Sequence, residues 1–367
     1  MSDTAVNTFI EIARSEMELE RHLAQWHTLA KNALDANIFY EPSPFLAAIN
    51  TFAEDWPFLC LFVYQKRPKG DQLIGFMPLL PARKGPGNHL RCYRSFTHLH
   101  CYLATPLIHR ESSQEAVASI FNWFNNASGS CRLLGLYNIQ ADGGFAKILK
   151  QSVSDQPHVV EQSFERALIT RREDPERYFS ENLSRHRQKE HRRLWRRLEE
   201  KGTLTLKTYQ NSESIDEWID DFLILEASGW KGTSGAAMGN SPAHSDFFVQ
   251  IVQQLATSGQ LIRHSLHQGD RIIAMKCNLI AADGRSSFAF KIAFDESFAR
   301  YSPGVLLELQ NIEHLFCQTS LDWMDSCADP DHPMIDRLWR ERRQISYILY
   351  GKKSLSGRLL MKLFRPK

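Results

Sequence analysis

Three side chains between residues 291 and 332 could move a proton or stabilise a negative charge. Lys291 stands in FAFKIAF, a run of apolar and aromatic residues that predicts a β-strand, and a lysine there could stabilise an oxyanion. Asp325 lies in the next predicted strand, where a carboxylate could act as a general base. His332 follows in a turn, and histidine titrates near neutrality, which suits a proton relay. Together they are typical of a site that deprotonates a nucleophile and stabilises an oxyanion.

Each of these residues also has a structural interpretation. Strand alternation places Lys291 on the face opposite Phe290 and Ile292, and its side chain could simply extend along the strand to solvent. Asp325, with the aspartates at 329 and 331 and His332, could be taken as metal ligands. No second histidine or cysteine stands at ligand spacing with them, so no metal is expected.

A helix that could hold an anion at its N-terminus follows the lysine strand. After a polar turn, Pro303 and Gly304 open an apolar-periodic segment that predicts a helix. The free amides of a first helical turn and the positive end of the helix dipole favour a phosphate. The expected phosphate-binding residues are Arg300, Tyr301, Ser302, Pro303, Gly304 and Val305. The alternative is an ordinary helix N-terminus with a tight turn.

A basic face and a glycine-rich loop could contact a substrate. Arg185, Lys189 and Arg192 share one face of a helix expected over residues 174–200, and such a stripe suits an anionic partner. A solvated helix face with glutamates as partners is the alternative. Trp230 and Lys231 begin the loop GWKGTSGAAMGNSP, which could close over a bound molecule.

The composition is that of a globular protein with a substantial core. Of the 367 residues, 43% are hydrophobic and 23% charged, and the net charge is only +2. Seven scattered cysteines without CxxC spacing indicate reduced, buried thiols. No signal peptide and no transmembrane run is recognised, so a cytoplasmic location is expected. The basic, amphipathic C-terminal segment is compatible with weak docking on a membrane surface or with a terminal helix packed on the domain.

The order of predicted elements divides the chain into two domains, at 1–160 and 161–367. The first half reads as helix, hairpin, strand, helix, strand and helix, without a glycine-rich turn after its central strand. The second half contains all of the candidate residues above. The first domain is therefore interpreted as a partner that does not itself hold a phosphate-bearing ligand.

Three stretches of the second half together resemble a known family. They are LEASGWKG, FKIAFDESFARYSPGVLLEL and DWMDSCADPDHPMIDRLWRERR. These resemble the GNAT-superfamily acetyltransferases of the CelD-like group, which is associated with bacterial cellulose and exopolysaccharide production. That group is distantly related to the Fem-type peptidyltransferases, which carry two GNAT-like domains. The pattern departs from the usual GNAT phosphate fingerprint, because Arg300 lies one residue too far from Gly304 and Leu306 replaces a small residue.

The resemblance implies an α/β (α+β) fold of two tandem GNAT-like domains, each a mixed, mainly antiparallel sheet flanked by helices. It implies a degenerate domain at 1–160 and, at 161–367, a catalytic domain that binds acetyl-CoA or another acyl-CoA as co-substrate. The implied activity is N-acylation of an amine acceptor, such as an amino sugar or an envelope or polysaccharide precursor. Trp230, Lys231, Arg185, Lys189 and Arg192 would then contact the acceptor.

Two other functions remain open from the sequence. One is a Fem-like transferase that uses aminoacyl-tRNA, with the basic helix as the tRNA contact; in the acyl-CoA interpretation no nucleic acid is expected. The other is a non-catalytic binding module that kept the fold. In the acyl-CoA interpretation the amine attacks the thioester directly, because no cysteine stands in a recognisable nucleophile setting.

Overall fold

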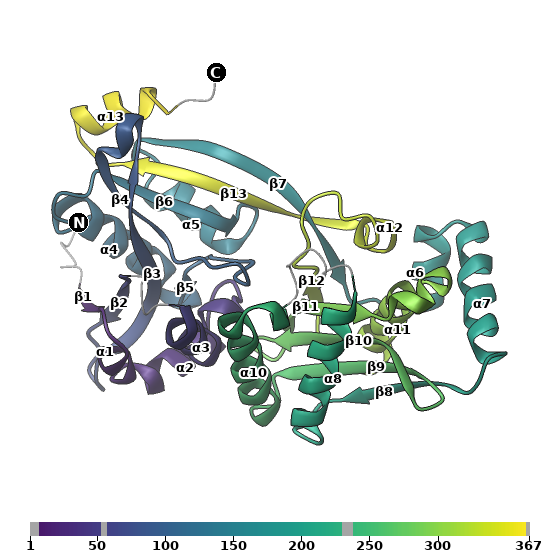
Figure 1. The fold of residues 1–367 in the computed structure, drawn as a ribbon. Helices are drawn as coiled ribbons and strands as arrows, with labels where there is room; N and C mark the ends of the chain where they lie inside the picture. The colour runs from purple at the N-terminus through teal and green to yellow at the C-terminus, as the bar shows by residue number, and fades with distance from the viewer. Residues whose placement is uncertain (1–6, 53–56, 230–237, 365–367) are drawn as a thin grey trace. The chain divides into compact units, whose positions relative to one another are not determined.

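A computed structural model describes residues 7–52, 57–229 and 238–364 of the chain (Figure 1). The chain forms two compact units, which we call unit 1 and unit 2. Unit 1 comprises Met1–Glu165 together with Arg343–Lys367, and unit 2 comprises Arg166–Arg342. The sequence expectation assigned the last residues of the chain to the second domain. In the structure they belong to unit 1, because the C-terminal strand pairs with a strand of that unit.

The sheet of unit 1 is antiparallel except at one pair. The strand order is β1-β2-β3-β4-β6-β13, in which only β4 and β6 run parallel. The short strand β5 pairs with β3. The strands are β1 (Thr8–Ala13), β2 (Leu59–Gln65), β3 (Gln72–Lys84), β4 (Leu90–Ser95), β5 (Leu107–Ile108), β6 (Leu133–Gln140) and β13 (Glu341–Gly351).

Helices cover both faces of the unit 1 sheet because successive residues of β2 are buried on opposite sides. Phe62 packs with Trp26 and Phe76 in an aromatic cluster under the N-terminal helices. Leu61 and its alternate neighbours belong to an apolar core that includes residues of α4 and α5. The helices are α1 (Glu16–Glu20), α2 (Leu23–Lys31), α3 (Pro42–Phe52), α4 (Ser113–Asn126), α5 (Gly144–Ser152) and the C-terminal α13 (Leu355–Lys362).

The sheet of unit 2 repeats the same pattern of pairing. Its strand order is β8-β9-β10-β11-β12-β7, and only β11 and β12 run parallel. The strands are β7 (His158–Thr170), whose last residues pair with β12, β8 (Leu204–Tyr209), β9 (Leu261–Gln268), β10 (Arg271–Ile280), β11 (Ser286–Phe294) and β12 (Trp323–Asp325).

Two sets of helices sandwich the sheet of unit 2. In Figure 1, α8 crosses one face of β9 and β10, and α11 lies on the other face. Phe290 of β11 packs against Phe248 of α10 on the first face, whereas Ile262 of β9 and Ile312 of α11 share a core on the second. The helices are α6 (Pro175–Asn182), α7 (Arg185–Glu199), α8 (Ile215–Ser228), α10 (Pro242–Thr257), α11 (Pro303–Cys317) and α12 (Ile335–Leu338).

Two local expectations differ from the structure. The helix expected over residues 174–200 is two helices, because Leu183 has extended backbone and the Ser184 side chain accepts a hydrogen bond from the Arg187 N–H as a new N-cap. The sequence pattern Ser214-x-x-Glu217 predicts a capping box at the start of α8, but Ser214 has φ of 46° and makes no side-chain cap hydrogen bond. Within residues 7–52, 57–229 and 238–364, no helix is both long and apolar enough to cross a membrane.

Candidate functional site

The parallel strands β11 and β12 of unit 2 separate partway along their length. They pair from Ser286 with Trp323 to Phe288 with Asp325, where β12 ends, whereas β11 continues to Phe294. The chain leaving β12 turns toward β7, and the Ser326 N–H donates to the Ala167 carbonyl. We call the place where the two strands part the strand opening. Beyond Phe288, β11 has no described pairing with β12.

A β-bulge turns Lys291 toward the same side of the sheet as Phe290. Cys277 of β10 pairs with Lys291, but the next residue, Asn278, pairs with Ala289, so Phe290 is an extra residue in β11. The Phe290 ring packs on α10, and the Lys291 Nζ lies 5.3 Å from the centre of that ring. The expectation that Lys291 points away from Phe290 is therefore wrong, because the bulge interrupts the alternation of the strand.

Charged and titratable groups from several elements act on Lys291. They are Glu226 of α8, His244 of α10, Cys277 of β10 and Cys327, which follows β12. Burial lowers the pKa of the Lys291 ammonium, and the Glu226 carboxylate is the main group that opposes this shift. Burial also lowers the pKa of His244, and the positive charge of Lys291 adds to that effect. Lys291 is thus half-buried, and burial and the charges of these groups together change its pKa.

Asp325 is completely buried at the end of β12 beside the strand opening. Its Oδ1 accepts a hydrogen bond of 2.8 Å from the Cys327 N–H, across a turn in which Cys327 has φ of 53°. Trp323 packs edge-on against Phe288, and Met324 points into the core under α11. Strand alternation therefore places Asp325 on the α8 and α10 side, the same side as Lys291.

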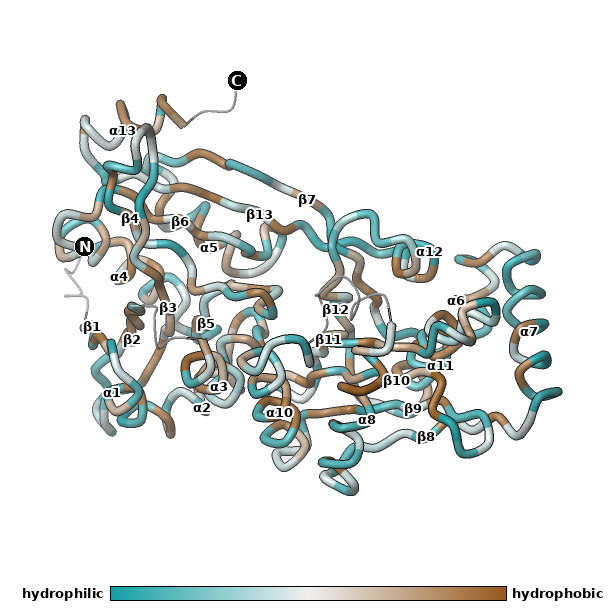
Figure 2. Tube along the Cα trace, in the orientation of Figure 1, coloured by the Kyte–Doolittle hydropathy of each residue, from teal (hydrophilic) through white to brown (hydrophobic). Residues whose placement is uncertain are grey.

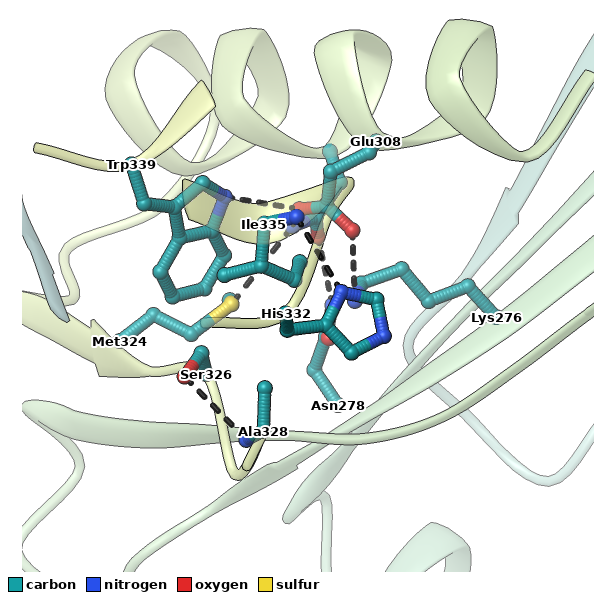
Figure 3. Close-up of polar contacts among 10 residues, drawn as sticks. Lys276, Asn278, Glu308, Met324, Ser326, Ala328, His332, Ile335 and Trp339 are labelled. Atoms are coloured by element: carbon teal, nitrogen blue, oxygen red, sulfur yellow. Dashed lines mark hydrogen bonds and ion pairs between the residues drawn. The ribbon is translucent and has the colours of Figure 1, made fainter. Parts of the chain in front are cut away.

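His332 is held at the start of α12. Its Nδ1 accepts a hydrogen bond of 3.3 Å from the Ile335 N–H, and its carbonyl accepts another from the Asp336 N–H (Figure 3). These bonds hold the His332 ring and carbonyl against the backbone just before α12, with Nδ1 as the acceptor. His332 is not one of the described groups whose charge changes the pKa of Lys291.

The predicted phosphate-binding segment has a specific local structure. Ser302 adopts a left-handed conformation, with φ of 51°, between a 3₁₀ helix at Glu296–Tyr301 and α11. Its carbonyl accepts hydrogen bonds from the N–H groups of Val305 and Leu306, at 3.0 and 3.1 Å. The Val305 amide, expected to be available to a ligand, is thus already engaged within the first turn of the helix.

Gly304 and Arg300 each have a packing role in this segment. A Cβ on Gly304 would lie 3.2 Å from the Phe294 ring, so the glycine allows α11 to pack closely on β11. Arg300 is exposed, and its guanidinium carbon lies 4.8 Å from the centre of the Tyr301 ring, while Tyr301 and Pro303 are buried. The segment therefore presents a cation and a helix N-terminus, but with fewer available amides than the sequence suggested.

A buried polar network fixes α11 on the sheet beneath this segment (Figure 3). Lys276 Nζ lies 2.9 Å from Glu308 Oε2, and their side chains are 2% and 0% exposed. Glu308 Oε1 accepts hydrogen bonds from Asn311 Nδ2 and from the Trp339 indole N–H, at 2.9 and 3.2 Å. Asn278 Nδ2 donates to Asn311 Oδ1 at 2.7 Å. Both Glu308 oxygens thus have a neighbour, Oε2 the Lys276 ammonium and Oε1 two N–H donors, so Glu308 has structural partners rather than an open ligand site.

The basic residues of α7 are on the surface of unit 2. Arg185, Lys189 and Arg192 are all exposed, and Figure 2 shows α7 as a largely hydrophilic helix. Leu194 and Leu198 attach α7 to a core that contains Tyr301 and Leu306. The structure therefore brings the basic helix close to the start of α11, a proximity that the sequence did not indicate.

Two expected residues cannot be placed, and one residue was missed. Trp230 and Lys231 lie outside the described residues. Glu226, which the sequence analysis did not single out, is buried near Lys291. The signal available was its place in LEASGWKG, directly before the glycine-rich loop. Among the residues that the structure describes, no group of three or more His, Cys, Asp or Glu side chains could surround a metal ion.

Comparisons with known proteins identify a domain and a fold. Residues 185–332 match the family model of the acetyltransferase (GNAT) domain. No curated protein sequence matches the chain. The structure of FemX is similar over 96% of this chain and 100% of FemX, with 9% identity and a TM-score of 0.56.

Two further solved structures are similar over nearly the whole chain. A conserved protein of unknown function from Bacteroides thetaiotaomicron has 8% identity and a TM-score of 0.56, covering 94% of this chain and 100% of that one. The C-terminal domain of a putative lysylphosphatidylglycerol synthetase from Agrobacterium fabrum has 12% identity and a TM-score of 0.51, covering 92% and 95%. These likenesses show the fold, and with the repeated strand pairing they confirm the expected α/β class with GNAT-like architecture.

Proposed function

We propose that the protein is an acyl-CoA-dependent N-acyltransferase whose reaction takes place at the strand opening of unit 2. The observation that carries the proposal is the position of this opening inside the residues that match the acetyltransferase (GNAT) domain. Lys291 and Asp325, chosen from the sequence, both lie on one side of the sheet there. The co-substrate would be acetyl-CoA or another acyl-CoA.

The proposed chemistry is direct attack of an amine on the thioester carbonyl. The new C–N bond forms a tetrahedral oxyanion, and cleavage of the C–S bond then releases the thiolate. Asp325 accepts the proton of the attacking amine, and the Lys291 ammonium stabilises the oxyanion. His332, through its Nε2, relays the proton to the departing thiolate.

In this proposal an extended thioester lies along β11 and reaches the start of α11. Beyond Phe288, β11 continues without β12 beside it in the described pairing, and the start of α11 follows near the basic helix. Arg300 and the segment Tyr301–Val305 would face the phosphates, aided by the helix dipole. Arg185, Lys189 and Arg192, with Trp230 and Lys231, would contact the acceptor. In line with the CelD-like resemblance, we propose an amino sugar or another envelope or polysaccharide precursor as that acceptor.

A binding experiment tests this function before any acceptor is known. Isothermal titration of acetyl-CoA and longer acyl-CoA thioesters into the full chain should show one binding site per chain and a raised melting temperature. Desulfo-CoA is a matched probe, because it keeps the phosphates and removes the thiol. Absence of binding for every thioester would contradict the proposal.

The exposed basic face of α7 favours a second candidate, an aminoacyl-tRNA-dependent transferase. Arg185, Lys189 and Arg192 are exposed cations of one helix, and Arg192 lines a cavity with Leu309 and Glu313 of α11. Binding of charged tRNA that weakens steeply with salt, without thioester binding, would support this candidate over the first. Binding of a thioester without transfer to any amine would instead indicate a non-catalytic module.

A further inference from the structure

We propose that Glu226 is a positioning residue for Lys291. The Glu226 carboxylate keeps the lysine charged and directed toward the strand opening. The inference rests on the proposed acyl transfer, because an oxyanion requires a lysine that carries its proton. It adds to that function a residue from α8, outside the strands to which the sequence analysis assigned the chemistry.

The position of Glu226 is the first part of the argument. Its side chain is 3% exposed on α8, which packs against β11. The carboxylate oxygen Oε2 accepts a hydrogen bond of 2.9 Å from the Met238 N–H, which fixes its orientation. Glu226 also lines a small cavity together with Ile292 and Phe294, the residues of β11 directly beyond Lys291. Glu226 therefore lies beside the stretch of β11 that follows Lys291.

The bulge in β11 is the second part. Without the extra residue Phe290, alternation would direct Lys291 to the α11 side, where Lys276 already occupies the buried ion pair with Glu308. The bulge directs Lys291 to the α8 side, where Glu226 lies. The bulge thus places Lys291 away from the buried Lys276 ammonium and on the side of the Glu226 carboxylate. This placement is consistent with a site in which the charge of Lys291 takes part in the reaction.

The charges around Lys291 are the third part. At neutral pH the Cys277 thiol is protonated, because burial raises its pKa to about 12. His244, whose pKa is lowered, is neutral there and adds no positive charge. The Cys327 thiol is the remaining group that acts on the lysine. Among the described groups that act on Lys291, Glu226 is thus the carboxyl group, and its charge opposes the lowering of the Lys291 pKa by burial.

The test measures the titration of Lys291 directly. The full chain carrying lysine labelled with ¹³C at Cε and ¹⁵N at Nζ gives one side-chain signal per lysine, and Lys291→Arg assigns the signal of Lys291. In Glu226→Gln the amide oxygen can still accept from the Met238 N–H, so the variant removes the charge and keeps that hydrogen bond. We expect the midpoint of Lys291 to fall by about one pH unit or more. Glu226→Asp, which keeps a carboxylate, should stay near the wild type.

Controls and outcomes follow from the same helix. Glu217→Gln removes an exposed carboxylate of α8 and should leave the Lys291 midpoint unchanged. With an amine acceptor, the alkaline limb of kcat/KM should move to lower pH in Glu226→Gln by the same amount as the midpoint. The inference is overturned if the titration midpoint of Lys291 is unchanged in Glu226→Gln. It is also overturned if that midpoint shifts while the alkaline limb of kcat/KM does not. Because the midpoint is measured without turnover, a wild-type protein that transfers no acyl group would overturn the proposed function separately.

Discussion

Units 1 and 2 have the same order and direction of strands. They differ in the path that the chain takes where the two parallel strands end. In unit 1 the chain that leaves β4 stays beside β6: the Ala104 N–H donates to the Asn138 carbonyl, and the Gln140 N–H donates to Thr105 Oγ1. In unit 2 the chain that leaves β11 forms a 3₁₀ helix and then α11, and β12 turns toward β7. In unit 1 the backbone after β4 therefore stays hydrogen-bonded beside the end of β6, whereas in the described part of unit 2 the chain after β11 leaves the parallel pair.

The helix that follows the parallel strand also differs in its buried face. In unit 1, α4 contributes Val117, Ile120 and Phe124 to an apolar core. In unit 2, α11 contributes Glu308 and Asn311 to a buried polar network, with Lys276 on the sheet. The comparison teaches that one strand order can support a packed scaffold or a candidate site, and that loops and a few buried charges decide which.

The largest effect is expected at the strand opening. Asp325→Asn should lower kcat/KM for acyl transfer by roughly 10²- to 10⁴-fold, since it removes the proposed general base. Tyr137→Phe in unit 1, which removes the hydroxyl that bonds Lys84, should leave the transfer rate unchanged. Rates are measured with acetyl-CoA and an amine acceptor by thiol release. Equal losses in the two variants would remove the distinction between the units.

The buried ion pair should separate the units by stability. Lys276→Met leaves Glu308 charged in the core and should lower the free energy of unfolding by about 3–5 kcal/mol. Lys84→Met in unit 1 breaks a pair whose side chains are 26% and 22% exposed and should cost about 1 kcal/mol or less. Urea denaturation measures both.

A double variant controls for the lost packing. Lys276→Met combined with Glu308→Leu removes both charges and should recover much of the stability, because the isolated buried carboxylate is gone. If Lys276→Met alone lowers the free energy of unfolding as little as Lys84→Met does, the buried ion pair of unit 2 contributes no more to stability than the partly exposed pair of unit 1.

Acid should destabilise unit 2 before unit 1. Burial, with His314 and Lys276 nearby, lowers the pKa of His264 in the folded state from 6.5 to about 3. The unfolded chain therefore binds this proton more readily, so stability is complete above pH 6.5 and falls as the pH decreases. The expected slope is about 1.4 kcal/mol per pH unit between these values.

Hydrogen exchange at pH 7 and pH 5 measures this difference for peptides of each unit. In unit 1, burial also lowers the pKa of His22, but the nearby Glu11 carboxylate opposes the shift and reduces the sensitivity to acid. His264→Gln should flatten the pH dependence of unit 2. Faster loss of protection in unit 1 than in unit 2 would contradict the expectation.

The smallest effect is expected in the loop of unit 1 that follows β4 and lies beside β6. Thr105→Val removes the buried hydroxyl that accepts from the half-buried Gln140 N–H and should cost about 1–2 kcal/mol of stability. Thr28→Val on the exposed face of α2 is the matched control, with a change of about 0.5 kcal/mol or less. Thioester stoichiometry should remain one per chain. Binding of a second thioester to Thr105→Val would show that unit 1 retains a site.

Much of the local structure could be predicted from the sequence. The hairpin expected in the first half corresponds to β2 and β3, the apolar run around Lys291 to β11, and the pair Pro303-Gly304 to the start of α11. Lys291 and Asp325 were selected by type and strand position, and the structure places both beside the strand opening. These features follow from interactions between residues that are close in the sequence.

Other features of the site depend on contacts that local patterns do not encode. The bulge at Phe290, which reverses the direction of Lys291, arises from pairing with β10. Glu226 is a polar residue in an amphipathic helix until packing of α8 on β11 buries it. The hydrogen bonds from Val305 and Leu306 to Ser302 reduce the available amides of α11, a detail that sequence spacing cannot show.

The sequence by itself determined which segments form strands and helices and which side chains could do chemistry, because hydrophobic periodicity and backbone preferences act over a few residues. The tertiary structure decided that β13 completes unit 1, that the loop after β4 stays beside β6 and that Glu226 lies near Lys291. Those contacts join residues far apart in the chain, and they form only where the packing of several elements compensates the entropy lost in closing the loops between them.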